Sequence, residues 1–224
     1  MVKRYVGLLV FGLLLTAGCR TVQDTALPTD FYRVRQASRY GLPAQPVYVR
    51  EQNDTLQFWQ SHSTTPVVIP PERADELRFY RFEADVDVFT LPFKIRPARA
   101  AVPPQLNSNF NAALYLGRRI DFYRYRTEQI SPTLARRRLL SQGIGYGVFA
   151  GIGSSVINST VTRGLVTDEY EGVILDAGLA VIYDARVFNV GLAVGLDHLL
   201  DRNKQYWIYQ QRPWFGVLFG LNLN

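Results

Sequence analysis

The sequence predicts an all-β protein: a small antiparallel transmembrane β-barrel of about eight strands, with an irregular N-terminal segment and one short helix. Three observations carry this prediction: long alternations of apolar with small or polar residues, glycines at every second position of one run, and loops or tight turns between the runs. Successive side chains of a strand point to opposite faces, so each run presents one apolar face. A barrel in a bilayer turns that face toward lipid and keeps small and polar residues inside.

The clearest alternation lies between Gly143 and Asn224. Every second residue from Phe188 to Leu196 is apolar, and the runs over 173–183 and 215–223 follow the same rule. A soluble sandwich would turn such faces inward against a second sheet, which is the main alternative. Five glycines, Gly143, Gly145, Gly147, Gly151 and Gly153, share one face of a run whose other face is mostly apolar. No Lys follows them, so the spacing fits neither a dinucleotide-binding turn nor a P-loop. A crowded barrel interior explains them better.

Earlier strands begin near Leu77, where the run from Phe82 to Thr90 alternates with acidic residues. Ser131 and Pro132 resemble a helix start, so a short basic helix is expected through Leu140. Six strands are convincing, whereas small barrels of this class have about eight. Segments 31–35 and 47–50, or a second chain, would supply the rest.

The amino terminus resembles an export signal. Lys3 and Arg4 precede a short apolar run that ends in small residues at 16–18, which predicts a signal peptide over residues 1–18. The run is too short for a membrane-spanning helix. The segment Leu15-Thr16-Ala17-Gly18-Cys19 resembles the lipobox of bacterial lipoproteins, which implies that Cys19 becomes the first residue and carries acyl chains such as palmitate. An ordinary signal peptide with a chance cysteine is the alternative.

Residues 19–76 differ from the rest, because prolines interrupt them and no long alternation survives. They are expected to form a lipid-anchored tether with a possible hairpin, formed by 47–49 and 56–59 around a turn at 53–54. Residues 77–224 form the predicted barrel domain. Cys19 is the single cysteine, so no disulfide can form within the chain.

The net charge of +6 needs no nucleic-acid partner. The signal peptide would remove Lys3 and Arg4, and much of the remaining excess lies in Arg136, Arg137 and Arg138.

Loop lengths predict the orientation. The connection at 184–187 is tight, whereas 159–170 and 199–213 are long, and outer-membrane barrels have their short turns in the periplasm. The N-terminal segment and the C-terminus are therefore expected in the periplasm. Aromatic residues would mark the two membrane rims. The inner rim would hold Tyr183 and Phe188, and the outer rim Tyr206, Trp207, Trp214 and Phe215.

Charged residues on the predicted interior faces are the candidate site residues. They are Glu83, Asp85, Asp87, Arg119, Asp176 and Asp197. Paired carboxylates can catalyse acid–base reactions, but buried charges in a narrow barrel more often pair and fill the interior. Asp197 and His198 are adjacent and point to opposite faces, so they cannot form the hydrogen bond of a Ser-His-Asp triad while the strand stays regular.

The last strand resembles the C-terminal assembly signal of outer-membrane barrels, with Gly216, Phe219 and Leu221 in place. Segments 85–93 and 214–224 also look like uncharacterised outer-membrane proteins of Bacteroidota, a resemblance that implies a Gram-negative outer membrane and no activity. The expected role is a non-enzymatic outer-membrane lipoprotein, without cofactor or metal. It would contact outer-membrane lipid and serve as a structural, binding or accessory subunit of an envelope complex, or associate with itself. The alternative is a lipid-modifying barrel enzyme or a lipocalin-like small-ligand-binding lipoprotein.

Overall fold

The computed structural model describes residues 26–52, 55–61, 63–184 and 188–221, and over these residues the protein is all-β. The helical segments in these ranges are short 3-10 turns. None of the helices there is long and apolar enough to cross a membrane. The predicted signal peptide, Cys19 and residues 185–187 of the predicted tight connection lie outside the described residues.

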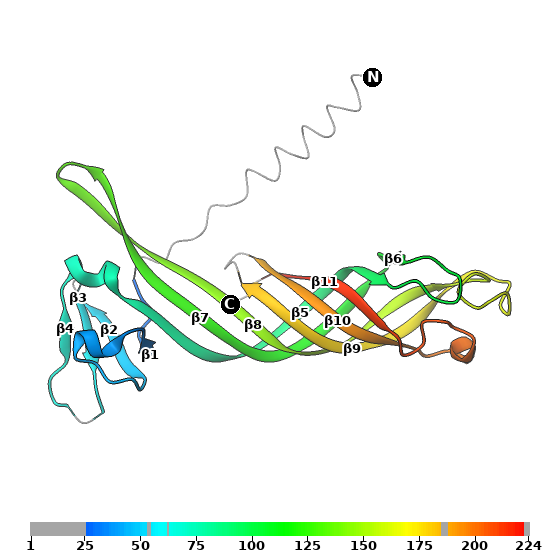
Figure 1. Ribbon diagram of the computed structural model, residues 1–224, viewed down its shortest axis with the longest axis horizontal. Helices are drawn as coiled ribbons and strands as arrows, with labels where there is room; N and C mark the ends of the chain where they lie inside the picture. The colour runs from blue at the N-terminus through cyan, green and yellow to red at the C-terminus, as the bar shows by residue number, and fades with distance from the viewer. Residues whose placement is uncertain (1–25, 53–54, 62, 185–187, 222–224) are drawn as a thin grey trace, which may run out of the picture.

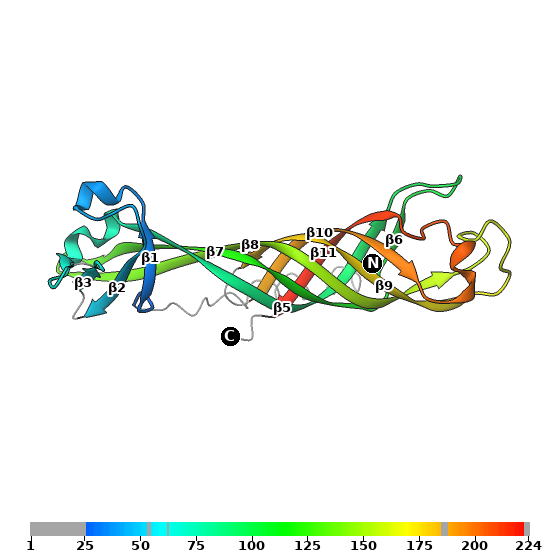
Figure 2. The ribbon, with the colours of Figure 1, turned by 90° about the horizontal axis from the view of Figure 1, so that it is seen from below.

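Six long strands form one antiparallel sheet whose pairings return to the first strand (Figures 1 and 2). They are β5 (Arg78–Arg96), β7 (Asn111–Ser131), β8 (Leu134–Ile157), β9 (Tyr170–Asp184), β10 (Phe188–Leu199) and β11 (Pro213–Leu221). Each pairs with the next, and β11 also pairs with β5, where Phe215 lies opposite Ile95. We call this cycle of pairings the strand ring. The expectation of about eight strands is not confirmed, since the described cycle has six.

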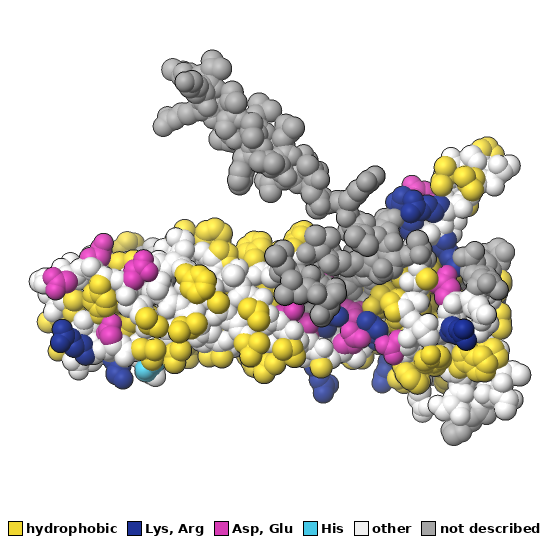
Figure 3. Space-filling view, turned by 180° about the vertical axis from the view of Figure 1, so that it is seen from behind, with side chains coloured by type: hydrophobic (Ala, Val, Ile, Leu, Met, Phe, Trp, Pro, Cys, Tyr) yellow, Lys and Arg dark blue, Asp and Glu magenta, His cyan; other side chains and the backbone are white. Residues whose placement is uncertain are grey.

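The apolar face of every strand in the ring points outward. On β10, Leu192 is 70% exposed, while its neighbours Gly191 and Ala193 are buried. Figure 3 shows hydrophobic side chains along the long body and charged side chains toward its two ends. We call the outward set the apolar belt. It consists of Phe82, Val86, Val88, Phe93, Ile95, Leu114, Leu116, Ile144, Tyr146, Val148, Ile152, Val173, Leu175, Leu179, Val181, Leu192, Val194, Leu196, Phe215 and Phe219.

The interior of the ring is filled by side chains at mid-height. The buried cluster there consists of Phe89, Leu91, Ala113, Tyr115, Phe149, Ala180, Ile182, Ala193, Trp214 and Leu218. Small residues make room for these large ones. A Cβ added to Gly178 would lie 2.1 Å from the Val194 carbonyl oxygen, and one added to Gly147 would lie 2.3 Å from the Leu116 oxygen. Glycine therefore lets neighbouring backbones and interior aromatic groups approach closely.

The N-terminal residues form a smaller sheet beside the ring. Its elements are β1 (Asp30–Val34), η1 (Ala37–Tyr40), β2 (Val47–Gln52), β3 (Thr55–Trp59), β4 (Val67–Ile69) and η2 (Pro71–Glu76). The predicted hairpin is confirmed, because β2 pairs with β3. β1 joins the ring only at the start of β5, where Arg33 lies opposite Tyr80. These strands thus make a sheet of their own and do not complete the ring to eight.

The predicted basic helix at Ser131–Leu140 is wrong, because β8 begins at Leu134 and continues the hairpin with β7. β7 pairs with β5 only as far as Arg124, and β8 pairs with β9 only from Gly143 onward. Residues 125–142 thus form a two-stranded arm beyond the ring (Figure 1). Burial favours a strand over a helix here, because Tyr125 and Leu139 point inward and pack on the core of the small sheet. Tertiary packing of this kind overrides a local helix signal.

Glu51 on β2 links the small sheet to the arm. Its carboxylate accepts hydrogen bonds from the Leu27 N–H at 2.9 Å, from the Tyr125 hydroxyl and from the Arg137 guanidinium. Burial and the hydrogen bond to Glu51 raise the pKa of Tyr125, so its hydroxyl stays protonated and can donate. Arg137 also lies over the Tyr125 side chain, 4.7 Å from its centre. One carboxylate therefore holds three donors from separate segments.

Glu51→Ala is expected to loosen the small sheet from the arm. Removing one partner of a buried charge network costs about 3–5 kcal/mol, and Glu51→Ala removes a carboxylate to which both Arg137 and Tyr125 donate. Hydrogen–deuterium exchange should show faster exchange across residues 47–59. The matched control is Glu128→Ala, which removes the exposed partner of Arg138 and should cost about 1 kcal/mol or less. Equal exchange in both variants would contradict this assignment.

Candidate functional site

A buried charge cluster lies inside the ring toward the long loops. Lys94 Nζ is 2.5 Å from Asp176 Oδ2 and 3.1 Å from Asp197 Oδ1, and the Lys94 side chain is 0% exposed. The Arg96 guanidinium contacts Asp197 Oδ2 and donates to the Ser155 hydroxyl at 3.1 Å. The two predicted carboxylates of this end are thus brought together and neutralised by two cations from β5. We call these four charged residues the outer cluster.

Lys94 and Arg96 were not expected inside. Continuing the alternation of Phe82–Thr90 would place both outward. The pairing of β11 with β5 shifts register here: Val217 lies opposite Phe93, and Phe219 lies opposite Thr90. β5 therefore carries one extra residue around Pro92, a bulge that reverses the faces beyond it. The proline inside a strand was the signal that could have indicated this, because it cannot donate to a neighbouring strand.

A second cluster lies inside the ring near the small sheet. Arg119 is central, with its guanidinium 3.1 Å from Glu83, 2.9 Å from Asp121 and 3.3 Å from Asp184. Arg119 Nη1 is also 3.7 Å from Asp85. The ion pairs extend along the inward face toward the small sheet through Arg81, which contacts Glu83, Asp121 and Asp30 of β1. Asp87 stands beside this inner cluster and accepts a hydrogen bond from Asn189 at 3.1 Å.

All six sequence-predicted charged residues therefore point into the ring, but they form two groups. Glu83, Asp85, Asp87 and Arg119 belong to the inner end, and Asp176 and Asp197 belong to the outer end. The aromatic and aliphatic cluster around Tyr115 and Trp214 lies between the groups. Asp121, Asp184 and Arg81 are members that the sequence analysis missed. The alternation of β7 would have placed Asp121 on the same face as Arg119.

The six aromatic residues predicted at the rims differ in exposure. Tyr183, Phe188, Tyr206 and Phe215 are exposed on the outside. Trp214 and Trp207 are instead buried, so their assignment to the rim is wrong. Trp214 precedes Phe215 on one strand and must point the opposite way. Lys94 Nζ lies 4.5 Å from the centre of the Trp214 side chain, and the Arg96 guanidinium lies 5.1 Å from that of Trp207, so both indoles support buried cations.

The segment between β10 and β11 caps the outer end of the ring. Trp207, Ile208 and Tyr209 pack with Ile157, Ile174 and Leu199 as a buried cluster. Tyr209 also lies under the Arg96 guanidinium, 5.5 Å from it. The long loop is thus folded inward over the outer cluster and excludes solvent from it.

His198 does not meet Asp197. The carboxylate of Asp197 points inward to Lys94 and Arg96, whereas His198 Nδ1 contacts Gln210 Nε2 at 2.9 Å. Gln210 Oε1 accepts from the Leu199 N–H at 2.9 Å, which orients the amide so that its nitrogen faces the imidazole. His198 therefore serves to hold the capping loop against β10.

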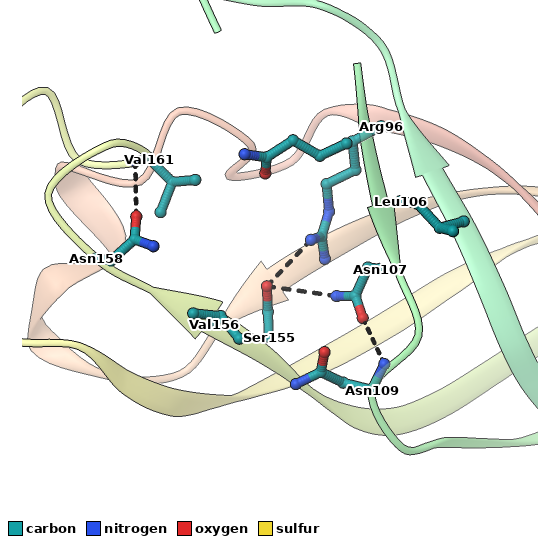
Figure 4. Close-up of a pocket in the computed structure, with 9 residues that line it drawn as sticks. Arg96, Leu106, Asn107, Asn109, Ser155, Val156, Asn158 and Val161 are labelled. Carbon is teal, nitrogen blue, oxygen red and sulfur yellow. Dashed lines mark hydrogen bonds between the residues drawn. The ribbon is translucent and has the colours of Figure 1, made fainter. Parts of the chain in front are cut away.

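A small polar pocket of about 280 Å³ opens beside the outer cluster (Figure 4). Ser155 accepts hydrogen bonds from Arg96 and, at 3.5 Å, from Asn107 of β6 (Gln105–Asn107). Asn107 in turn accepts from the Asn109 N–H at 2.8 Å. Arg96, Asn107 and Ser155 are thus already hydrogen-bonded within the pocket. Its volume lies at the lower limit for small-molecule sites.

Among the described residues, no group of three or more His, Cys, Asp or Glu side chains is arranged to hold a metal ion. Comparisons of the chain with family models, curated proteins and solved structures gave no match.

Asp197→Asn is expected to destabilise the ring strongly. It leaves two buried cations to share one carboxylate, and breaking a buried pair costs about 3–5 kcal/mol. Guanidinium unfolding of the protein in detergent should show the loss as a lower midpoint with an unchanged slope. Glu171→Gln is the matched control, since Glu171 is exposed and its carboxylate accepts a hydrogen bond from the Ser154 hydroxyl at 3.0 Å. A midpoint for Asp197→Asn equal to that of the control would contradict the role of the outer cluster.

Proposed function

We propose that the strand ring is a small transmembrane β-barrel, part of an outer-membrane lipoprotein anchored through Cys19. In this proposal the protein is a non-enzymatic structural, binding or accessory subunit of an envelope complex. The small sheet, the arm and the C-terminus lie in the periplasm. The observation that carries the proposal is the apolar belt, which runs around all six strands of the ring on the outward face.

Water is an unfavourable environment for such a surface. Soluble monomers rarely expose continuous apolar patches of more than a few hundred Å², and exposure costs about 25 cal/mol per Å². Acyl chains remove this cost without any second protein layer. The alternation then has the sense expected in a membrane, with apolar residues outside and charged residues inside.

The height of the belt supports a bilayer. From Val86 to Ile95 on β5, nine steps of about 3.4 Å, inclined by about 45°, would rise by roughly 22 Å. The apolar band of outer-membrane barrels is about 25 Å tall. On the inner side, the exposed Arg118 of β7 interrupts the outward face opposite Ala84, and Arg124 and Gln142 follow beyond it; the capping loop follows on the outer side. The belt is therefore bounded by polar residues at both ends.

The filled interior supports a role other than transport. A cycle of six strands encloses less volume than the eight-stranded barrels, whose interiors are already filled by side chains. Here two ion-pair clusters, an apolar cluster and a capping loop occupy that space. We propose that the barrel passes no solute and serves as an anchor that holds the small sheet and the arm at the membrane surface.

The two ends of the strand ring differ, and this difference supports an orientation of the ring in the membrane. The segments 97–110, 158–169 and 200–212 lie together at one end, while the small sheet and the arm lie at the other (Figures 1 and 2). A lipid anchor at Cys19 would lie eleven positions before Asp30, where the small sheet begins. The periplasmic assignment of the small sheet places that anchor at the same membrane surface as Tyr183 and Phe188.

The enzyme and lipocalin alternatives have less support. Asp197 is engaged by two cations and His198 by Gln210, so neither faces the other or Ser155. A lipocalin-like site needs an open barrel interior, and the interior of the strand ring is filled.

Leu192→Arg is expected to hinder membrane insertion. Leu192 lies midway along β10 on the apolar belt, where an arginine facing lipid costs about 2–4 kcal/mol. The measurement is the fraction of purified protein that refolds into phospholipid vesicles, read from flotation and from heat-sensitive gel mobility. Leu165→Arg is the control, because Leu165 is 64% exposed in an outer loop, and it should insert as the unmodified protein does. If Leu192→Arg inserts normally, or the parent protein stays in water, the membrane proposal fails.

A further inference from the structure

A groove lined by arginine side chains lies where the strand ring meets the small sheet. It has a volume of about 830 Å³, and its lining includes Arg35, Arg78 and Arg124 together with Tyr80, Phe122 and Tyr183. We call it the arginine groove. It opens on the outward faces of β5, β7 and β8, whereas the small sheet packs on their inward faces through Phe79, Tyr123 and Leu139.

Strand pairing brings the three cations together. Arg78 of β5 lies directly opposite Arg124 of β7, and the Arg35 N–H donates to the Arg78 carbonyl at 2.9 Å. All three are exposed, and within the described part of the chain no carboxylate forms an ion pair with them. By contrast, the neighbouring Arg81 contacts three carboxylates on the inward face.

Like charges directly opposite each other in a sheet are destabilising. An anion bound between Arg78 and Arg124 would remove that repulsion. Guanidinium groups recognise phosphate by paired, charge-assisted hydrogen bonds, so a phosphate group suits a groove lined by three arginines.

The surroundings indicate a ligand that is both anionic and apolar. Tyr80 contacts Phe82 edge-on, with 6.0 Å between the centres of the two side chains, so the groove leads directly into the apolar belt. Phe122 and Tyr183 flank it, and both are exposed. A phosphate among the arginines would leave attached acyl chains lying along Phe82 and Ile144. Free phosphate would not contact the aromatic side chains of Tyr80, Phe122 and Tyr183.

We propose that the arginine groove binds the phosphate of an anionic phospholipid in the leaflet that faces the small sheet, with the acyl chains along the apolar belt. This inference rests on the proposed membrane-spanning function. It assigns the groove a specific role, which is to fix the depth and rotation of the protein in the bilayer and so to position the arm.

The test uses the full protein purified in a neutral detergent. Phosphatidylglycerol and phosphatidylcholine are added in equal amounts, and native mass spectrometry measures the ratio of the two bound lipids. The unmodified protein should prefer phosphatidylglycerol. The double variant Arg78→Gln/Arg124→Gln should lose about tenfold of that preference, which corresponds to about 1.4 kcal/mol.

Two further variants serve as controls for the position and for the geometry of the arginines. Arg126→Gln removes an exposed arginine on the same face of β7 but outside the groove, and it should keep the preference. Arg124→Lys keeps the charge and loses the planar fork, so it should lose part of the preference while folding normally. Heat-sensitive gel mobility checks folding in every variant. Folded double variants with the preference unchanged would overturn the proposal, as would an equal loss in Arg126→Gln.

A separate measurement distinguishes binding of a lipid from binding of a free anion. Inorganic phosphate alone should raise the thermal midpoint of the protein less than phosphatidylglycerol does, and an equal rise would overturn the lipid assignment. Flotation with vesicles separates the two proposals. Protein that inserts into vesicles but shows no lipid preference contradicts the groove alone, whereas protein that does not insert contradicts the membrane function itself.

Discussion

Buried charges inside a narrow ring of strands must find partners, and this requirement constrains the rest of the structure. Lys94 of β5 contacts carboxylates on β9 and β10, and Arg119 of β7 contacts carboxylates on β5 and β9. These contacts join strands far apart in the sequence, so they fix the register in which the strands close on one another. A one-residue slip would turn each charge outward and leave its partner unpaired. The apolar belt is the other consequence of the same register.

The sequence predicted much of the ring, because alternation is a local property. The faces of Asp85, Arg119, Asp176 and Asp197 follow directly from the period of a strand. The pairing of particular charges did not follow, since it depends on which strands face each other across the interior. The bulge at Pro92 shows the limit most clearly. One extra residue reverses the faces of β5, and so two cations that counting would place outward lie inside.

The arm and the tryptophans were mispredicted for a related reason. Ser131 and Pro132 carry a sound helix-start signal, but the residues after them pack as a strand because Leu139 meets the core of the small sheet. Trp214 was expected at a membrane rim from its residue type, although its position next to Phe215 already required the opposite face. Residue type indicates which environment a side chain prefers, whereas its position in the strand decides which face it occupies.

The two halves of the molecule complement each other. The ring has an outward surface suited to lipid and a filled interior, while the small sheet has a core of its own that it shares with the base of the arm. Glu51 and the core around Phe79 and Tyr125 couple the halves, so the arm leaves the ring in a defined direction. An anchored, plugged ring of strands would thus hold a rigid element at the membrane surface.

The central claim is that the outward rows touch acyl chains, and nitroxide scanning tests it most directly. Labels placed singly at Leu179 and Leu192, and at the inward positions Ala180 and Ala193, would be compared in phospholipid vesicles, with Leu165 as the aqueous reference. The account predicts that both outward labels collide more often with oxygen, which dissolves in lipid, than with a water-soluble nickel complex, while inward labels are shielded from both. Outward labels that collide mainly with the nickel complex, as at Leu165, would contradict it.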